Sequence, residues 1–410
     1  MSNVYIVGVG MTPLGKHTEL SVKDLSARAV TAALADAGCA VADIQAAWFC
    51  NTRQGIFEGQ HNIRGQVALR PIGIAGVPIF NTDNACASST AGLSLARNWV
   101  RSGAADVVLV VGAEKMNFPD KRKEMFQAFK GSMDVNLGEA QLQGVIELSR
   151  ALPLPPEQAQ VERSIFMDSY SAHARYHMLR YGTTPRQLAH VAAKNHWNSQ
   201  FNPYAQYQTP MTVEEVLADK MIAWPLTRSM CAPMTDGAAA IVLCSERALK
   251  RFDRKRAIRI LACQITTGIS HAPEDNENNV GRLAALRAYE EAGIGPHDLS
   301  VAEVHDASSF GELKQIENIG LCAAGESGPF TEQGHTRLDG KIPVNPSGGL
   351  LSKGHPVGAT GAIQMHELVT QLRGEAGKRQ VPGARLAAAE NGGGAYDGEE
   401  AIAATTILSK

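Results

Sequence analysis

A cysteine set among small residues is the first feature of the chain that could do chemistry. Cys86 lies in the stretch 81–93, which reads NTDNACASSTAGL, and a helix-like run over 93–100 follows it. A thiol on the first turn of a helix faces unpaired N–H groups and the positive end of the dipole, which lowers its pKa from about 8.5 toward neutrality. We therefore expect Cys86 to be a nucleophile. The structural alternative is a buried cysteine in a tight strand-to-helix turn.

Three further polar or glycine-rich segments lie toward the other end of the chain. They are the pair His305-Asp306, the segment 345–361 that begins with Asn345 and contains His355, and Glu390 with the glycine run 392–394. Each follows a predicted strand or precedes a predicted helix, where α/β sheets hold their ligands. Any one of them alone is compatible with a turn. Together with a nucleophile they predict an active site.

The elements that must position these residues form a repeat. A strand, a helix and a strand are predicted over 4–9, 21–37 and 46–50, and the same order recurs over 258–264, 280–292 and 301–305. Both helices end at a glycine, Gly38 in the first copy and Gly293 in the second. Alternating strands and helices build mostly parallel sheets with helices on their faces. The sequence therefore predicts an internally duplicated α/β protein.

The repeat extends to the candidate catalytic residues. Cys86 stands before Gly92 at the start of a helix, and a strand over 106–111 follows. His355 stands at the same spacing before Gly361, ahead of a helix over 362–372 and a strand over 384–389. A pseudo-twofold duplication would bring the two helix starts face to face. We therefore expect Cys86 and His355 to share one pocket.

The duplication divides the chain into an N-terminal half, 1–250, and a C-terminal half, 257–410. Residues from about 115 to 228 have no counterpart in the second copy, so we interpret them as an inserted loop domain, with helices over 164–181 and 184–197. An insertion at the edge of a catalytic core is suited to be a substrate lid or a cofactor cradle. The alternative is that it only thickens a subunit interface.

Composition excludes several classes of protein. The 410 residues are enough for two or three domains, and 44% hydrophobic with 20% charged residues is typical of a globular protein. A net charge of −2, with no basic block beyond 250–255, argues against nucleic acid. No apolar run is long enough for a membrane span, and the N-terminus has no signal-peptide pattern. Seven scattered cysteines without a C-x-x-C pair argue against disulfides or a metal site, and the expected compartment is the cytoplasm.

The Cys86 turn, the Gly354-His355-Pro356 segment and the glycine run 392–394 resemble the signature blocks of the thiolase superfamily. Segments 176–184, 195–196, 202–206 and 372–383, together with His305-Asp306, are similar to the sterol-carrier or lipid-transfer type of thiolase. The resemblance spans essentially the whole chain. It implies a five-layered αβαβα fold, a dimer or tetramer, and no tightly bound cofactor. It also implies a coenzyme A thioester as substrate, with Cys86 acylated and His355 as the base.

The resemblance also assigns supporting roles around the nucleophile. The backbone N–H groups of Cys86 and Gly392 would form an oxyanion hole, and His305 with a water would polarise the thioester carbonyl. Asn345 would be a supporting residue that fixes the His355 loop. Asp306 would support the site in the same way, unless it simply pairs with His305, which is the structural alternative for that histidine.

The chain departs from the thiolase pattern at the second cysteine. Degradative and biosynthetic thiolases carry it at the position of Glu390, and the sterol-carrier type carries it at the position of Ala307. Either another group moves the second proton or the protein does not carry out ordinary thiolysis. Glu390 is the candidate group if burial raises its pKa toward neutrality. Its alternative role is to orient the glycine loop.

Three functions remain open on the sequence. The first is an acyl-CoA acyltransferase that forms or cleaves a β-ketoacyl-CoA through acyl-Cys86. The second is a thiolase-fold C–C lyase or C-acyltransferase, acting for example on a steroid side chain, with a small OB-fold and zinc-ribbon partner. The third is a non-catalytic acyl-CoA or lipid binder, which would not need Cys86 opposite His355. Candidates for contact with the coenzyme A phosphates in the insertion are Arg175, Arg180 and Lys194.

Overall fold

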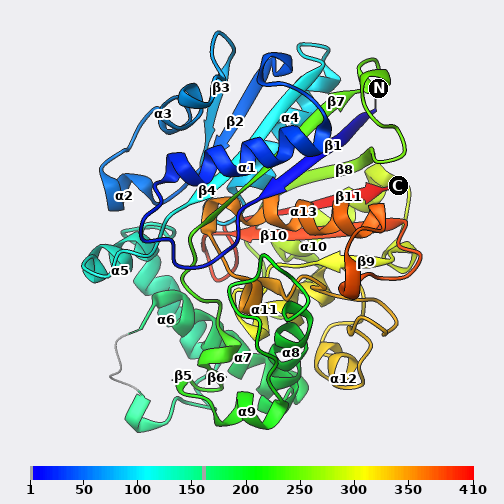
Figure 1. Ribbon diagram of the computed structural model, residues 1–410. Helices are drawn as coiled ribbons and strands as arrows, with labels where there is room; N and C mark the ends of the chain where they lie inside the picture. Colours follow the sequence, from blue (N-terminus) through cyan, green and yellow to red (C-terminus); the bar gives the residue numbers. More distant parts are fainter. Residues whose placement is uncertain (1–2, 159–162) are drawn as a thin grey trace.

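Nine strands from the described residues, 3–158 and 163–410 of a computed structural model, form one mixed β-sheet (Figure 1). Their order across the sheet is β3-β2-β4-β7-β1-β8-β11-β10-β9. The strands are β1 Val4–Met11, β2 Ala46–Cys50, β3 Ile79–Thr82, β4 Val107–Glu114, β7 Gly237–Ser245, β8 Ile258–Thr267, β9 Val301–Glu303, β10 Leu386–Gly393 and β11 Ile402–Ser409. β5 (Met221–Ala223) and β6 (Leu226–Thr227) form a separate small hairpin.

The strand order shows the duplication directly. Counted outward from the centre, β1, β7, β4 and β2 on one side correspond to β8, β11, β10 and β9 on the other. The two halves meet where β1 pairs antiparallel with β8, through Tyr5 with Arg259 and Ile6 with Ile258. In the first half β7 pairs antiparallel with β1, and in the second half β11 pairs antiparallel with β8, although a long stretch of chain separates the strands of each pair. The predicted duplicated α/β architecture is confirmed.

Helices complete the layers. They are α1 Val22–Ala37, α2 Gln54–Glu58, α3 Arg64–Leu69, α4 Ser88–Arg101, α5 Arg122–Lys130, α6 Gly138–Leu148, α7 Ile165–Tyr181, α8 Pro185–Ser199, α9 Val213–Ala218, α10 Val280–Ala292, α11 Ser309–Asn318, α12 Ser327–Glu332 and α13 Thr360–Arg373. α1 covers β1 and β7, α10 covers β8 and β11, and α4 lies against α13 between the two halves of the sheet. This is the predicted αβαβα order, with α4 and α13 as the central layer.

The first helix shows why the local sequence folds as predicted. Ser21 caps α1 by accepting a hydrogen bond from the Asp24 N–H, and the Asp24 carboxylate accepts one from the Ser21 N–H in return. Gly38 ends the helix in the left-handed conformation at φ 66°. Between these caps, the buried side chains of α1 pack against the outer face of the sheet.

The inserted segment lies between β4 and β7 and holds α5 to α9 with the β5–β6 hairpin. α8 packs on α11, α12 and the turn Gly349–Lys353, so the insertion reaches elements of the second half (Figure 1). Within the described ranges, no helix has the length and apolar character needed to cross a membrane.

Candidate active site

Cys86 lies in a sharp turn between β3 and α4. Ala85 adopts the left-handed conformation at φ 49°, and Ser88 fixes the turn by accepting from the Asn84 N–H at 2.8 Å and donating to the Ala85 carbonyl at 2.6 Å. Gly393 packs against this turn so closely that a Cβ would lie 2.4 Å from the Asn84 carbonyl oxygen. Cys86 therefore stands two residues before α4, and the predicted position on the first helical turn is wrong by half a turn.

His355 follows a π-helical turn, Gly349–Lys353, that ends the second glycine-rich segment. Gly354 has φ 122°, which an L side chain rarely adopts, and a Cβ there would meet Thr235 at 2.8 Å. The His355 N–H donates to the Thr235 hydroxyl oxygen at 3.0 Å. The backbone that leads into His355 is thus fixed by a glycine conformation that other residues rarely adopt and by a buried threonine.

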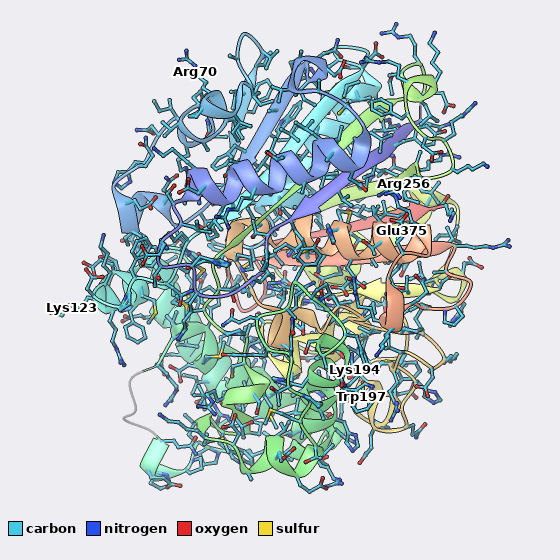
Figure 2. The ribbon with its side chains drawn as sticks, viewed as in Figure 1. Arg70, Lys123, Lys194, Trp197, Arg256 and Glu375 are labelled. Atoms are coloured by element: carbon cyan, nitrogen blue, oxygen red, sulfur yellow. The ribbon has the colours of Figure 1, made fainter. Side chains whose placement is uncertain are left out.

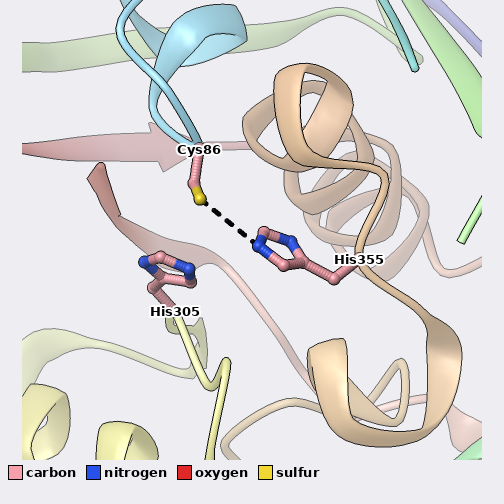
Figure 3. Close-up of side chains that lie close together, drawn as sticks. All are labelled: Cys86, His305 and His355. Carbon is pink, nitrogen blue, oxygen red and sulfur yellow. Dashed lines mark hydrogen bonds between the residues drawn. The ribbon is translucent and has the colours of Figure 1, made fainter. Parts of the chain in front are cut away.

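The two predicted residues meet. Sγ of Cys86 lies 3.3 Å from Nε2 of His355, and the His305 ring completes a group whose donor atoms all lie within 4.8 Å of one another (Figure 3). Three separate segments direct these side chains toward one point (Figure 3). Within the described ranges, these are also the side chains whose spacing would suit a metal ion. A thiol beside an imidazole is already a complete acid–base pair.

Hydrogen bonds around His355 favour one tautomer. Nδ1 lies 2.9 Å from the Thr360 hydroxyl oxygen, which in turn lies 3.0 Å from the Val357 carbonyl oxygen. A hydroxyl that donates to the Val357 carbonyl must accept from Nδ1–H. Nε2 then carries the lone pair and faces the sulfur of Cys86. This is the form that can take a proton from the thiol.

Burial keeps both partners neutral. It raises the pKa of Cys86 to about 11, while the Arg53 guanidinium and the N–H groups of Gly394 and Cys86 itself oppose the rise. The pKa of His355 is lowered well below 6.5 by burial, with His305 and Arg53 acting in the same direction. The expectation of a thiol with a pKa near neutrality is therefore wrong for the free protein, because the cost of burying a thiolate exceeds the help from the turn.

His305 is buried with both ring nitrogens lacking a hydrogen-bond partner among the described residues. Its ring centroid lies 5.4 Å from that of His355, and burial lowers its pKa to about 4. Asp306 does not pair with it, because that carboxylate accepts from Asn195 at 2.8 Å and from the Leu350 N–H at 2.7 Å. An unpartnered neutral imidazole on the cavity wall is available to a ligand.

The other predicted acidic and amide residues support this arrangement from behind. The Glu390 carboxylate accepts from the His305 N–H at 3.1 Å, and Asn345 accepts from the Val304 N–H at 2.9 Å. Burial raises the pKa of Glu390 well above 4.5, as predicted. Glu390 does not line the cavity, however, so the structure counts against direct contact with substrate. The structure gives Asp306, through Leu350, the role of fixing the turn before His355.

The glycine run contributes a different residue to the cavity wall than the predicted Gly392. Gly394, not Gly392, lines the cavity and directs its N–H at the Cys86 sulfur. Gly392 pairs with Ala403 in the sheet, and the side chain of Glu400 covers it so closely that a Cβ would lie 2.7 Å from Cγ. The sequence predicted that the glycine run lies at the site, but it did not predict which of its N–H groups points toward the Cys86 sulfur.

Glu114 is a site residue that sequence reasoning missed. Its carboxylate, at the end of β4, accepts from Asn51 and from the backbone N–H groups of Thr52, Arg53 and Gly358 at 2.8–3.1 Å. These donors come from the loop after β2 and from the loop that follows His355. One buried carboxylate thereby ties the two halves of the site together, and only its place at a strand end could have signalled this.

The group lines a cavity of about 960 Å³. Much of its wall is methionine and phenylalanine, namely Met116, Met125, Met167, Met211, Met234, Phe126, Phe129 and Phe166. Charged residues on the wall are Arg53, Arg163, Arg228, Glu215 and Asp219. Ala307, one of the positions where a thiolase would hold its second cysteine, also faces this cavity.

The structure does not bring the three predicted phosphate contacts to this cavity. Lys194 is buried on α8, where its ammonium pairs with Glu312 at 2.7 Å and donates to the Val344 carbonyl at 2.6 Å (Figure 2). Arg175 is buried and donates to the Leu152 carbonyl at 2.9 Å. Arg180 is exposed and lies over the Tyr181 ring. The prediction for Lys194 and Arg175 is corrected, because their charges already serve interior partners.

Comparison with known proteins agrees with this geometry. Residues 4–223 match the model of the thiolase N-terminal domain, and residues 265–410 match that of the thiolase C-terminal domain-like family. The chain is 36% identical to an acetyl-CoA acetyltransferase of Methanothermobacter thermautotrophicus over 96% of this chain and 97% of that one. It is 34% identical to sterol carrier protein 2 of Oryctolagus cuniculus, covering 95% of this chain and 70% of that one.

Solved structures share the fold. The structure titled Ltp2-ChsH2(DUF35) aldolase aligns with a TM-score of 0.78 at 23% identity, covering 99% of this chain and 97% of that chain. Human mitochondrial 3-ketoacyl-CoA thiolase in complex with CoA aligns with a TM-score of 0.69 at 17% identity, covering 100% and 98%. With the family models spanning most of the sequence, the chain belongs to the thiolase family and is an enzyme of its acyltransferase type.

Proposed function

We propose that the protein is an acyl-CoA acyltransferase that forms or cleaves the C–C bond of a β-ketoacyl-CoA through an acyl-Cys86 intermediate. The observation that carries the proposal is the 3.3 Å approach of the Cys86 sulfur to an unprotonated Nε2 of His355. A neutral imidazole at this distance can take the thiol proton as the sulfur attacks a carbonyl carbon. The thiolate then forms only when substrate is present.

Hydrogen-bond donors near the Cys86 sulfur can stabilise the negative charge that develops on the acyl oxygen during the attack. The N–H groups of Cys86 and Gly394 point at the sulfur, so an acyl oxygen on that sulfur lies within their reach. His305 offers a ring nitrogen with no protein partner to the thioester carbonyl. Removing one such donor typically costs about 3–4 kcal/mol in the barrier. Glu390 acts through the His305 backbone in this proposal, as a positioning residue.

The shape of the cavity supports a bulky apolar acyl group. Its volume of about 960 Å³ is at the upper end of the roughly 300–1,000 Å³ typical of small-molecule sites. Five methionine side chains line its wall, and their flexible thioethers adapt to irregular apolar ligands. Arg228, a wall residue whose side chain is exposed, replaces Arg175 and Lys194 as the proposed contact for coenzyme A phosphates.

Mass spectrometry of the intact protein mixed with acetyl-CoA and with a bulky aromatic acyl-CoA tests the proposal. We expect a single acyl adduct that peptide mapping assigns to Cys86. The matched control is Cys231→Ser, because Cys231 lines the same cavity but has no histidine partner within hydrogen-bond distance. An adduct that persists in Cys86→Ser, or no adduct with any thioester, would contradict an acyl-enzyme.

A second candidate function is a C–C lyase or C-acyltransferase that works with a small OB-fold partner. It is favoured by Ala307 and Glu390 at both positions of the second thiol, and by the structural match to an aldolase solved with a DUF35 protein. Size-exclusion chromatography with light scattering on the protein from its native host distinguishes a homodimer or tetramer, which we also propose, from a complex with a small second chain.

A further inference from the structure

Two cavities meet at Tyr170. The second cavity has a volume of about 440 Å³, and Phe166, Tyr170 and Gly394 line both it and the first. Titratable groups on its wall include His173, His271, Lys314, Glu399 and Glu400. Tyr170 comes from α7 of the insertion, so it is a residue that the insertion places between the nucleophile and this polar chamber.

The Tyr170 hydroxyl has no hydrogen-bond partner among the described residues. Ionisation of Tyr170 is opposed first by burial and then by Glu400, Cys86 and Glu390, which raise its pKa well above 10. The hydroxyl therefore stays protonated at neutral pH, and Tyr170 shares one cavity wall with Cys86 and the other with Glu400. A buried phenol normally finds a partner, so an unsatisfied one that borders two cavities is available to a ligand.

Glu400 lies behind Tyr170 in the turn between β10 and β11. Its Oε1 accepts from Gln315 at 2.7 Å, and its side chain packs on Gly392. Burial and the charge of Glu399 raise the pKa of Glu400 to about 7, against the opposing influence of Lys314. Glu400 therefore exchanges its proton near neutral pH. Burial and the charge of Glu400 raise the pKa of Glu390 well above its usual range.

We propose that Tyr170 performs the proton transfer that thiolases assign to a second cysteine, and that Glu400 supplies and recovers the proton. The inference deepens the proposed function and rests on it. Ala307 and Glu390 occupy the two positions where thiolases carry the second cysteine, so neither position supplies a thiol. Tyr170 is the catalytic residue in this scheme because it lines the cavity that holds Cys86. Glu400 acts through it.

The protons balance over one cycle of cleavage. The Cys86 sulfur bonds to the β-keto carbon and its proton moves to His355, while the bond between the α- and β-carbons breaks. The electrons of that bond remain on the α-carbon, which takes a proton from Tyr170, and Glu400 returns a proton to Tyr170 through water in the second cavity, which both residues line. In the second half, the thiol of coenzyme A loses its proton to Glu400 through Tyr170 and attacks the acyl group. Cys86 leaves and recovers its proton from His355.

Deuterium exchange into the methyl group of acetyl-CoA in D₂O isolates this step, because it needs the second base but no C–C bond. In Tyr170→Phe we expect exchange to fall about 100-fold or more, with acetylation of Cys86 retained. Tyr176→Phe is the matched control, because Tyr176 lies on the same helix and lines only the second cavity. Equal exchange in both variants would overturn the proposal.

The pH dependence separates Glu400 from a structural residue. Exchange requires ionised Glu400 and should rise through pH of about 7, whereas cleavage requires protonated Glu400 and should fall over the same range. Lys314, Glu399, Glu390 and Tyr170 are the charged or titratable groups that face it. Glu400→Gln should remove both inflections, and inflections that persist would overturn its role. Loss of the Cys86 adduct in the wild-type protein would instead refute the proposed function.

Discussion

Cys86 and His355 are separated by 269 positions in the chain and by 3.3 Å in space. Each lies in the segment that leads into a helix of the central layer, α4 after Cys86 and α13 after His355, with one helix from each copy of the repeat. Ser89 on α4 accepts from the Ala362 N–H of α13 at 2.9 Å, so the two helices are joined by a direct hydrogen bond near the site. The distance between nucleophile and base is therefore set by the packing of the two halves.

The first prediction concerns the reactivity of the resting thiol. Burial raises the pKa of Cys86 to about 11, so the thiolate fraction is small at pH 7 and grows as the pH rises toward that value. Alkylation of Cys86 by iodoacetamide, followed by peptide mass spectrometry, should be slow at neutral pH and should accelerate through pH 9–10, an approximate range set by that pKa. An inflection near pH 6–7 would show an ion pair in the free protein and contradict the neutral pair.

The second prediction concerns the tautomer of His355. Thr360→Val removes the oxygen that accepts from Nδ1–H, so the proton is no longer held on that nitrogen. We expect kcat to fall about tenfold, which corresponds to the roughly 1.4 kcal/mol of one hydrogen bond. Thr370→Val on the same helix, whose hydroxyl bonds only a helix carbonyl, is the control and should keep full activity. Equal activity in both variants would show that Thr360 does not set the tautomer.

The third prediction concerns the contact between α4 and α13. A Cβ at Gly361 would lie 1.9 Å from the Thr90 hydroxyl oxygen and 2.9 Å from its backbone nitrogen. Gly361→Ala must therefore separate the helices, and we expect it to lower the free energy of unfolding by about 1–3 kcal/mol with loss of activity. Urea unfolding measures the change. Gly144→Ala in α6 is the control, because nothing lies within 4 Å of its added Cβ. A stable, active Gly361→Ala would contradict the close packing.

The fourth prediction concerns the carboxylate that joins the two loops. Glu114→Gln replaces one accepting oxygen by an NH₂ group, which then faces donors such as the Gly358 N–H. Each buried donor left without an acceptor costs about 1–3 kcal/mol, so the melting temperature should fall by several degrees. The exposed Glu58→Gln is the matched control and should leave it unchanged. An unaltered melting temperature in Glu114→Gln would show that these bonds contribute nothing.

The sequence predicted the elements whose signals are local. α1 has its capping box and terminal glycine, and α10 has Gly293, so both were found at nearly the observed bounds. β7 and β11 were missed, although both are almost fully buried apolar runs. A strand buried on both faces loses the alternation that marks a half-exposed one, so no period pointed to them.

The site also contains residues that the sequence predicted and residues that it did not. Cys86 and His355 were predicted to meet because the repeat relates their positions. Tyr170 comes from the insertion and Glu400 from the short turn after β10; the two segments differ in length and sequence, so the repeat gave no signal and only long-range packing places them together. The degree of burial of a side chain was the second property that the sequence did not reveal. The shift in the pKa of Cys86 depends on how much protein surrounds the thiol, which its neighbours in sequence do not reveal.

The mirrored order of strands on either side of β1 and β8 bears on how this chemistry arose. An assembly of two identical ancestral halves would hold the same side chain twice at the crossing, either two thiols or two imidazoles. Once the copies are fused in one gene, each position can diverge by itself. Joining the halves therefore made an unlike couple of nucleophile and base accessible to evolution, which a symmetric pair of separate chains could not have encoded.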